Sequence, residues 1–322
     1  MRKLLLGTTA LAAAATLSAN AALADVSISG YYEWKYEATS SNVAANDGTK
    51  FDSDSEITFK FSNKTDSGLD IGMVAELMSD EGEASMDETS ISIAGGFGKV
   101  VLGGNDMVGE DYGVSASDLP LEETLTAGQS DSIGIKGADI SGLEADANKV
   151  AYHLPAMGGL TAGVSYYNSG KAGSTDSTAV GFKYGMEAGG ANITIGAATV
   201  TTEAASQDED SQVIGIKIGS GNITAAISQS TLEESGVNEE SNGASVQFKV
   251  SDGMTVTAHT FETKDSGNSE KYTSSGAEIA YTIASGLTAY INVDDFDYKV
   301  GTSSNNTAEN GTVSKLTIKA TF

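Results

Sequence analysis

The sequence predicts an all-β fold, a transmembrane antiparallel β-barrel of about sixteen strands. Apolar and polar residues alternate with period two along most of the 322 residues, which is the pattern of half-buried strands. Two kinds of connection alternate between these runs, short turns that are mostly glycine-containing and longer loops that are acidic or polar. Beyond the N-terminal segment, no apolar run is long enough for a transmembrane helix. Alternation alone also fits a soluble β-sandwich, but the sorting of the connections favours a membrane barrel.

The first 24 residues have the features of an export signal peptide. Arg2 and Lys3 are followed by an uncharged apolar stretch over 4–17, and Ala22-Leu23-Ala24 supplies small residues for cleavage. The apolar stretch is shorter than the roughly 20 residues that a membrane-spanning helix needs. We therefore expect 1–24 to be removed and 25–322 to form the barrel.

Half-buried strands follow one another from residue 26 to the C-terminus. In the last of them, Leu316, Ile318, Ala320 and Phe322 alternate with lysines and threonines. The predicted strands are 26–37, 50–62, 69–79, 86–94, 98–104, 148–154, 160–168, 177–187, 191–202, 211–218, 222–231, 242–250, 254–264, 272–283, 287–299 and 311–322.

The connections form two sets that alternate along the chain. Short turns are predicted at 63–68, 95–98, 155–159, 188–190, 219–221, 251–253 and 285–286. Longer polar loops are predicted at 38–49, 80–85, 105–147, 169–176, 204–210, 232–241, 265–271 and 300–310. Short turns at one end and long loops at the other are typical of outer-membrane barrels. Such a barrel pairs every backbone group in lipid, and sixteen strands leave a water-filled lumen for the polar strand faces.

The composition excludes several classes of function. With 44 acidic and 18 basic residues, the net charge of −26 opposes nucleic-acid binding. No cysteine is present, and His153 and His259 are the only histidines, so neither a thiol nucleophile nor a His-based metal centre is expected. No catalytic motif is recognisable, and we expect no enzyme activity and no resident cofactor. Acidic clusters such as Asp294, Asp295 and Asp297 lack EF-hand spacing and would hold Ca²⁺ only loosely.

The longest loop, 105–147, carries ten acidic residues and one lysine. Loops beyond about 12–15 residues are usually functional or disordered, and we interpret this one as a constriction loop folded into the barrel. A solvated acidic surface loop is the alternative. The predicted acidic site residues are Asp106, Glu110, Asp111, Asp118, Glu122 and Glu123.

Lysines on the polar strand faces form the second predicted site. Lys35, Lys60, Lys99 and Lys319 come from strands near the point of barrel closure, and we expect them to line the wall opposite the acidic loop. The alternative is scattered charge without a common height, because sequence does not give the shear of a barrel. Because acidic residues outnumber lysines, the sequence predicts a modest preference for cations.

Aromatic residues on the apolar faces suit the interfacial girdles of a membrane barrel. They are Tyr32, Trp34, Tyr36, Tyr166, Tyr184, Tyr281 and Phe322.

Two segments and the C-terminus resemble the Gram-negative general porins, especially the alphaproteobacterial Rhodobacter-type trimeric porins. The segments are FSNKTDSGL at 61–69 and ISIAGGFGKVVLGG at 91–104, and the chain ends on the aromatic Phe322. The resemblance implies sixteen strands, a homotrimer, a third loop that narrows the pore, and Phe322 as an assembly signal. It also implies passive diffusion of small hydrophilic solutes across the outer membrane, among lipid and lipopolysaccharide, with 26–36 and 69–77 as candidate trimer contacts.

The chain departs from that family pattern at three places. Asn105 stands where many relatives have a charged residue, Ala320 stands where an aromatic is common, and no arginine follows Arg2. These departures bear on selectivity more than on architecture. The competing function is a secreted, acidic, soluble β-rich surface or adhesin-like protein, which the Gly-, Ser-, Thr- and Asn-rich composition favours.

Overall fold

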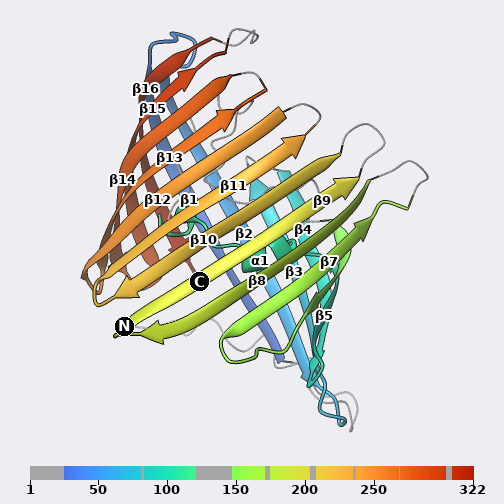
Figure 1. The fold of residues 1–322 in the computed structure, drawn as a ribbon. Coiled ribbons are helices and arrows are strands. Elements are labelled where there is room, and N and C mark those ends of the chain that lie inside the picture. Colours follow the sequence, from blue (N-terminus) through green and yellow to red (C-terminus); the bar gives the residue numbers. More distant parts are fainter. Residues whose placement is uncertain are drawn as a thin grey trace, which may run out of the picture.

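The computed structural model describes residues 25–80, 83–120, 147–170, 175–203, 208–234, 237–267, 269–301 and 307–322. These residues form sixteen antiparallel strands in one closed barrel (Figure 1). Each strand pairs with its neighbours in the sequence, and β1 pairs with β16. The predicted barrel of about sixteen strands is therefore confirmed.

The strands account for most of the described chain. The first eight are β1 Asp25–Ser41, β2 Gly48–Lys64, β3 Asp70–Asp80, β4 Glu83–Gly95, β5 Gly98–Gly104, β6 Asn148–His153, β7 Leu160–Asn168 and β8 Asp176–Ala188. The others are β9 Ala191–Glu203, β10 Glu209–Ser220, β11 Ile223–Glu234, β12 Val237–Ser251, β13 Met254–Asp265, β14 Glu270–Ala284, β15 Leu287–Lys299 and β16 Glu309–Thr321. A short helix, α1 (Val108–Tyr112), and a 3₁₀ turn, η2 (Ala116–Asp118), follow β5.

Several strands are longer than predicted at the end that carries the long loops. β1 continues to Ser41 rather than 37, and β12 begins at Val237 rather than 242. In β1 the extension pairs Ala38–Ser41 with β16, where both faces of the strand carry small or polar residues. Alternation of apolar and polar residues ends there although the backbone pairing continues, so pattern reading stops the strand early.

Closure of the barrel depends on the pairing of β1 with β16, which runs from Tyr31 opposite Thr321 to Ser41 opposite Gly311. Beyond it, the Gly30 and Phe322 backbones exchange two hydrogen bonds, each with an N···O distance of 3.1 Å. The closed order leaves none of the described strands as a free edge, which satisfies the backbone pairing that a hydrocarbon environment demands.

The two faces of the wall differ in polarity. On β1, Val26, Ile28 and Trp34 are exposed, whereas Glu33 between them points inward and is buried. The same phase continues around the barrel, with large apolar side chains exposed on the outer face. The predicted girdle residues Tyr32, Trp34, Tyr166, Tyr184, Tyr281 and Phe322 are exposed as expected. Tyr36 is half-buried, with its ring centroid 5.4 Å from that of Phe51.

The short turns have the glycine geometry that the sequence predicts. Gly159 precedes β7 with a φ of +88°, and a Cβ there would overlap the Gly185 carbonyl oxygen. Only glycine tolerates both the left-handed φ and this close approach. Among the described residues, no helix is long and apolar enough to cross a membrane.

Candidate functional site

Residues 105–120, the described part of the longest loop, have their own local structure. α1 ends at Tyr112 and is capped by Gly113, whose N–H donates to the Gly109 carbonyl at 2.8 Å. η2 begins with a capping box, in which Ser115 Oγ accepts from the Ser117 N–H at 3.1 Å and Asp118 Oδ2 accepts from the Ser115 N–H at 3.3 Å. These local bonds satisfy backbone groups that would otherwise be unpaired at the helix ends.

Apolar side chains of 105–120 pack on inward-facing side chains of the barrel. Met107, Val108 and Tyr112 form one buried cluster with strand residues. The strand residues of this cluster are Val101, Ala151, Ala179, Ala198, Val200 and Val213. Ala116 and Leu119 join a second buried cluster. Its strand residues are Ala226, Phe261, Tyr272, Phe296, Tyr298 and Val313. Residues 105–120 therefore lie against the inner wall of the barrel.

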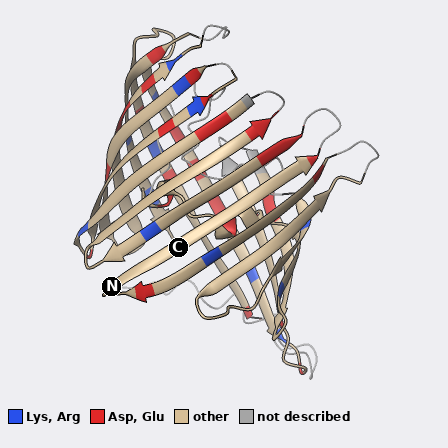
Figure 2. Ribbon diagram, viewed as in Figure 1, with Lys and Arg blue, Asp and Glu red and all other residues tan. Residues whose placement is uncertain are grey.

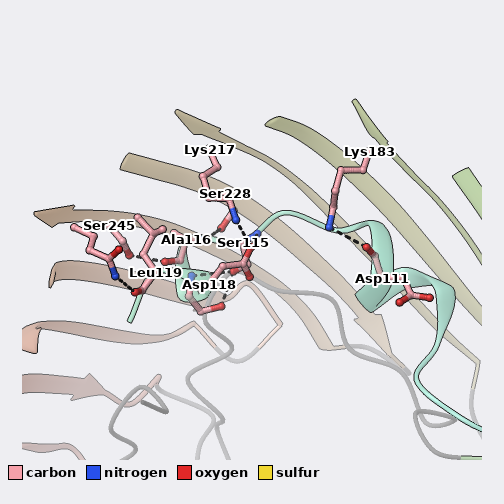
Figure 3. A network of polar contacts seen from close by, with 11 residues as sticks. Asp111, Ser115, Ala116, Asp118, Leu119, Lys183, Lys217, Ser228 and Ser245 are labelled. Carbon is pink, nitrogen blue, oxygen red and sulfur yellow. Dashed lines mark hydrogen bonds and ion pairs between the residues drawn. The ribbon is translucent and has the colours of Figure 1, made fainter. Parts of the chain in front are cut away.

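Side chains from the strands also bind the backbone of 105–120 (Figure 3). Ser228 Oγ of β11 accepts from the Ala116 N–H at 2.9 Å, and Ser245 Oγ of β12 donates to the Ala116 carbonyl at 2.6 Å. Lys183 Nζ of β8 donates to the Asp111 carbonyl at 2.9 Å. Because these contacts come from three strands on both sides of β9 and β10, they fix the path of the segment across the wall.

Three further contacts lie toward the two ends of the segment. Gln247 Nε2 of β12 donates to the Leu119 carbonyl at 2.7 Å. Ser165 Oγ of β7 accepts from the Val108 N–H at 3.3 Å. Lys149 Nζ of β6 donates to the Asn105 carbonyl. The wall thus holds the segment from β6 to β12.

A polar cleft of about 170 Å³ lies between the start of this segment and the wall of β3–β6. It is lined by the basic Lys99, the acidic Asp106 and Asp111, and the His153 imidazole. Asp111 Oδ2 is 3.8 Å from His153 Nδ1, which also contacts the Tyr112 hydroxyl at 2.9 Å. Burial raises the pKa of the Asp111 carboxyl, and the nearby Lys99 ammonium opposes that shift. The cleft can contact a small charged solute or ion through either sign of charge.

The predicted acidic residues are distributed along 105–120. Asp106 precedes α1, and Glu110 and Asp111 lie within it. Asp106 and Glu110 are exposed, whereas the Asp111 side chain keeps 43 % of its exposure and lines the cleft, where the surrounding wall reduces the hydration of its carboxyl. Asp118 Oδ2 is 3.9 Å from Lys217 Nζ of β10. Glu122 and Glu123 lie outside the described residues.

The predicted lysines do not form one cluster. Lys35 and Lys319 share a partner, because the Glu33 carboxylate binds Lys35 Nζ at 3.0 Å and also binds Lys319 Nζ. Lys99 lines the cleft described above. Lys60 lies elsewhere along the barrel, since it pairs with Ser27 on β1 whereas Lys35 pairs with Asp52 of β2.

Acidic residues are interleaved with these lysines on the same wall. Tyr31 lies under Lys319 Nζ, 4.2 Å from its ring centroid, and its hydroxyl donates to Asp54 Oδ2 at 3.0 Å. Strand phase predicts that Glu33 faces the lumen, but its two lysine contacts depend on the β1–β16 register, which the sequence does not give. Figure 2 shows further acidic residues at the loop-bearing ends of the strands. They include Glu203, Asp210, Glu234, Glu240, Asp265 and Glu309.

His259 and Asp294 form a buried pair on the inner face that sequence reasoning does not predict. His259 Nε2 of β13 is 2.6 Å from Asp294 Oδ1 of β15, across Gly276 of β14. A Cβ at Gly276 would overlap the Asp294 carboxylate, so the glycine permits a contact between strands that are not neighbours. In the described part of the chain, no group of three or more His, Asp and Glu side chains is placed to hold a metal ion.

Solved structures of similar fold are porins and outer-membrane proteins. A loop L8 deletion mutant of OmpT from Vibrio cholerae has a TM-score of 0.67 and 12% identity, over 93% of this chain and 99% of that chain. The anion-selective porin from Comamonas acidovorans has a TM-score of 0.67 and 16% identity, over 93% and 100%. A mutant of the Rh. blastica porin has a TM-score of 0.67 and 14% identity, over 92% and 100%. At these identities the likeness shows the fold alone.

No curated protein sequence matches the chain. The family model for Gram-negative porins matches residues 7–301, which is most of its length. With a closed barrel of matching fold, this match shows that the chain belongs to the Gram-negative porin family.

Proposed function

We propose that this porin forms a water-filled channel for passive diffusion of small hydrophilic solutes and ions across the outer membrane. The observation that carries the proposal is the polarity of the closed wall. Its outer face exposes large apolar side chains, and its inner face carries charged groups such as Glu33 and Lys319. A packed apolar core would not tolerate those inward charges, whereas the polar wall of a hydrated lumen accommodates them as ion pairs. The same polarity favours the channel over a soluble surface protein.

We propose further that 105–147 narrows this channel and that cations pass with a modest preference. The contacts of 105–120 with the inner wall support the first part. The second part is supported by the acidic residues of that segment and by the acidic loop ends of the strands. Rings of carboxylates favour cations, and low-dielectric walls focus their field. The lysines reduce this preference, and Glu33 offsets two of them.

The assembled protein is proposed to be a homotrimer among outer-membrane lipid and lipopolysaccharide. OmpT of Vibrio cholerae, a structural neighbour at 12% identity, is described in a trimer form. Residues 1–24, the predicted signal peptide, lie outside the described residues. Loose binding of Ca²⁺ by the acidic loops stays a prediction.

Planar-bilayer recording of the detergent-extracted protein tests the proposal. We expect a heat-modifiable oligomer that produces stepwise ionic currents. Under a KCl gradient, its reversal potential should have the sign that indicates a preference for K⁺ over Cl⁻. A protein that is freely soluble without detergent and adds no conductance would overturn the channel. A clear anion preference at low salt would overturn only the selectivity, because exposed charges act within about 8 Å at physiological ionic strength and further in dilute salt.

A further inference from the structure

Five strands present glycine to residues 105–120 at the points of contact. The glycines are Gly163, Gly181, Gly196, Gly215 and Gly243, here called the glycine row. They belong to β7, β8, β9, β10 and β12, and Ser228 of β11 stands in the gap, opposite both Gly215 and Gly243. Gly163 also pairs with Gly181, and Gly196 with Gly215. The row is therefore a continuous band of small residues across the inner wall.

The space above four of these glycines is filled by the segment itself, whereas a Cβ on Gly243 would lie 2.8 Å from the Phe261 ring and 3.0 Å from Ala116 Cβ. A Cβ on Gly181 would lie 2.7 Å from Tyr112 Cβ, and one on Gly196 would lie 2.5 Å from the Tyr112 carbonyl oxygen. At Gly215 a Cβ would overlap the Val114 carbonyl oxygen. Real Cβ atoms do not approach other heavy atoms so closely, so a side chain at these positions would have to displace the segment backbone.

Conformational freedom does not explain the glycines of the row. None of the five has a left-handed φ, so other residues fit their backbone. Glycine in a strand interior lowers stability, and residues with higher β-propensity are more common at such positions. Two neighbours on the same strands and the same face provide the contrast. A Cβ at Gly185 of β8 meets nothing within 4 Å, and one at Gly219 of β10 meets only Thr224 Oγ1 at 3.5 Å.

We propose that the glycine row is a positioning element that recesses residues 107–116 into the barrel wall and so keeps the aqueous path open. The strand contacts at Ser165 and Gln247 hold both sides of this stretch inside the barrel. A side chain in the row therefore lifts the segment toward the barrel axis and does not release it. The consequence for permeation rests on the proposed channel function, but the seating of the segment does not.

The chain contains no cysteine, so a crosslink between two introduced cysteines reports the seating directly. Ala116→Cys and Ser228→Cys replace two residues whose N and Oγ atoms are 2.9 Å apart, and a short thiol crosslinker joins them in the folded barrel. We expect Gly196→Val and Gly215→Val to lower the crosslinking yield by about fivefold or more, because they overfill an occupied site. Gly219→Val, on the strand of Gly215, keeps the parent yield.

The single-channel conductance of the same variants, without the cysteines, provides a second readout. We expect a lower conductance for Gly196→Val and Gly215→Val than for wild type, and a wild-type value for Gly219→Val. Gly215→Ala and its matched control Gly219→Ala replace the valine variants if a valine variant does not yield a heat-modifiable barrel.

Equal crosslinking in folded Gly215 and Gly219 variants, whether high or low, would overturn the proposal. An equal or higher conductance for the Gly215 variant would overturn the recessed position. If the wild type carries no current while the crosslinking yields differ as expected, the proposed channel function is wrong. The role of the glycine row in positioning residues 107–116 is then still supported.

Discussion

Two parts of the inner wall differ although their outer faces are alike. The charged wall, formed by β16, β1 and β2, carries large ionised side chains such as Lys319, Glu33 and Asp54. The glycine wall, formed by β7–β12, carries the glycine row and hydroxyl groups that bind a backbone segment. Both expose apolar residues outward, for example Trp34 and Phe182. The membrane thus constrains the outer face, and the inner face is specialised for separate tasks.

The chemistry of each wall indicates what it contributes. The Glu33 carboxylate and the Lys35 ammonium are largely buried, and the cost of removing such charges from water offsets much of their attraction, so we expect the Glu33 pairs to act mainly through the charge they place on the lumen wall. The glycine wall instead offers contact surface and hydrogen-bond partners for residues 105–120. We expect substitutions on the charged wall to change selectivity, and substitutions on the glycine wall to change conductance.

The largest effect is expected where the charged wall closes the barrel. Deleting Phe322 removes the two backbone hydrogen bonds with Gly30 and the predicted assembly signal. Each unpaired backbone group in lipid costs several kcal/mol, so folded protein in the outer membrane should fall by about tenfold. Quantitative blotting of membrane fractions measures this amount of folded protein. Cleavage of the precursor is the control that shows export to be unaffected. Normal surface levels of the truncated chain would contradict the role of this closure.

A smaller effect separates the two walls by ion selectivity. Glu33→Gln leaves Lys35 and Lys319 without the carboxylate that they share. We expect the permeability ratio of K⁺ to Cl⁻ to fall by about twofold in dilute salt, where charges are least screened. Conductance should change little, because the segment on the glycine wall keeps its contacts.

Asp70→Asn is the matched control, because it breaks the exposed Lys64–Asp70 ion pair at a strand end. It should leave the reversal potential unchanged. A selectivity shift of equal size in both variants would mean that total charge matters and not its place on the charged wall.

The smallest effect is expected from pH. The pKa of Asp111 is raised by burial, so this carboxyl takes up a proton at a higher pH than an exposed aspartate does. As the pH falls through this raised pKa, the segment on the glycine wall loses the negative charge of Asp111, and the cation preference should weaken. Reversal potentials from pH 7 to 4 measure the change. Asp111→Asn should lack the contribution of this carboxyl, and a pH profile identical to that of wild type would contradict this assignment.

The sequence predicts the strands well because their signal is local. The alternation of Val26, Ile28 and Trp34 with polar residues identifies both β1 and its outward face. The site depends on register and shear, which are not local. Glu33 meets Lys319 only because β1 and β16 pair in one register, and Lys60 lies far from Lys35 for the same reason.

The sequence does not predict the glycine row, because a glycine in a strand can indicate a bulge, a bend or the close approach of another backbone segment. Gly215 and Gly219 look alike in the sequence, and both are two residues from Lys217. Only the position of Val114 above Gly215 separates them. Glycine recurs on the polar faces of the strands that follow the longest loop, and this recurrence is the sequence signal that could have indicated the glycine row.

Single-channel conductance after deletion of residues 110–138 tests most directly whether the segment on the glycine wall restricts the aqueous path. The strands and their closure remain, so a heat-modifiable oligomer should still form. The account predicts a conductance about twofold or more above wild type, because the bare lumen of a sixteen-stranded barrel is an open aqueous channel. An unchanged conductance in a correctly assembled deletion variant would contradict it.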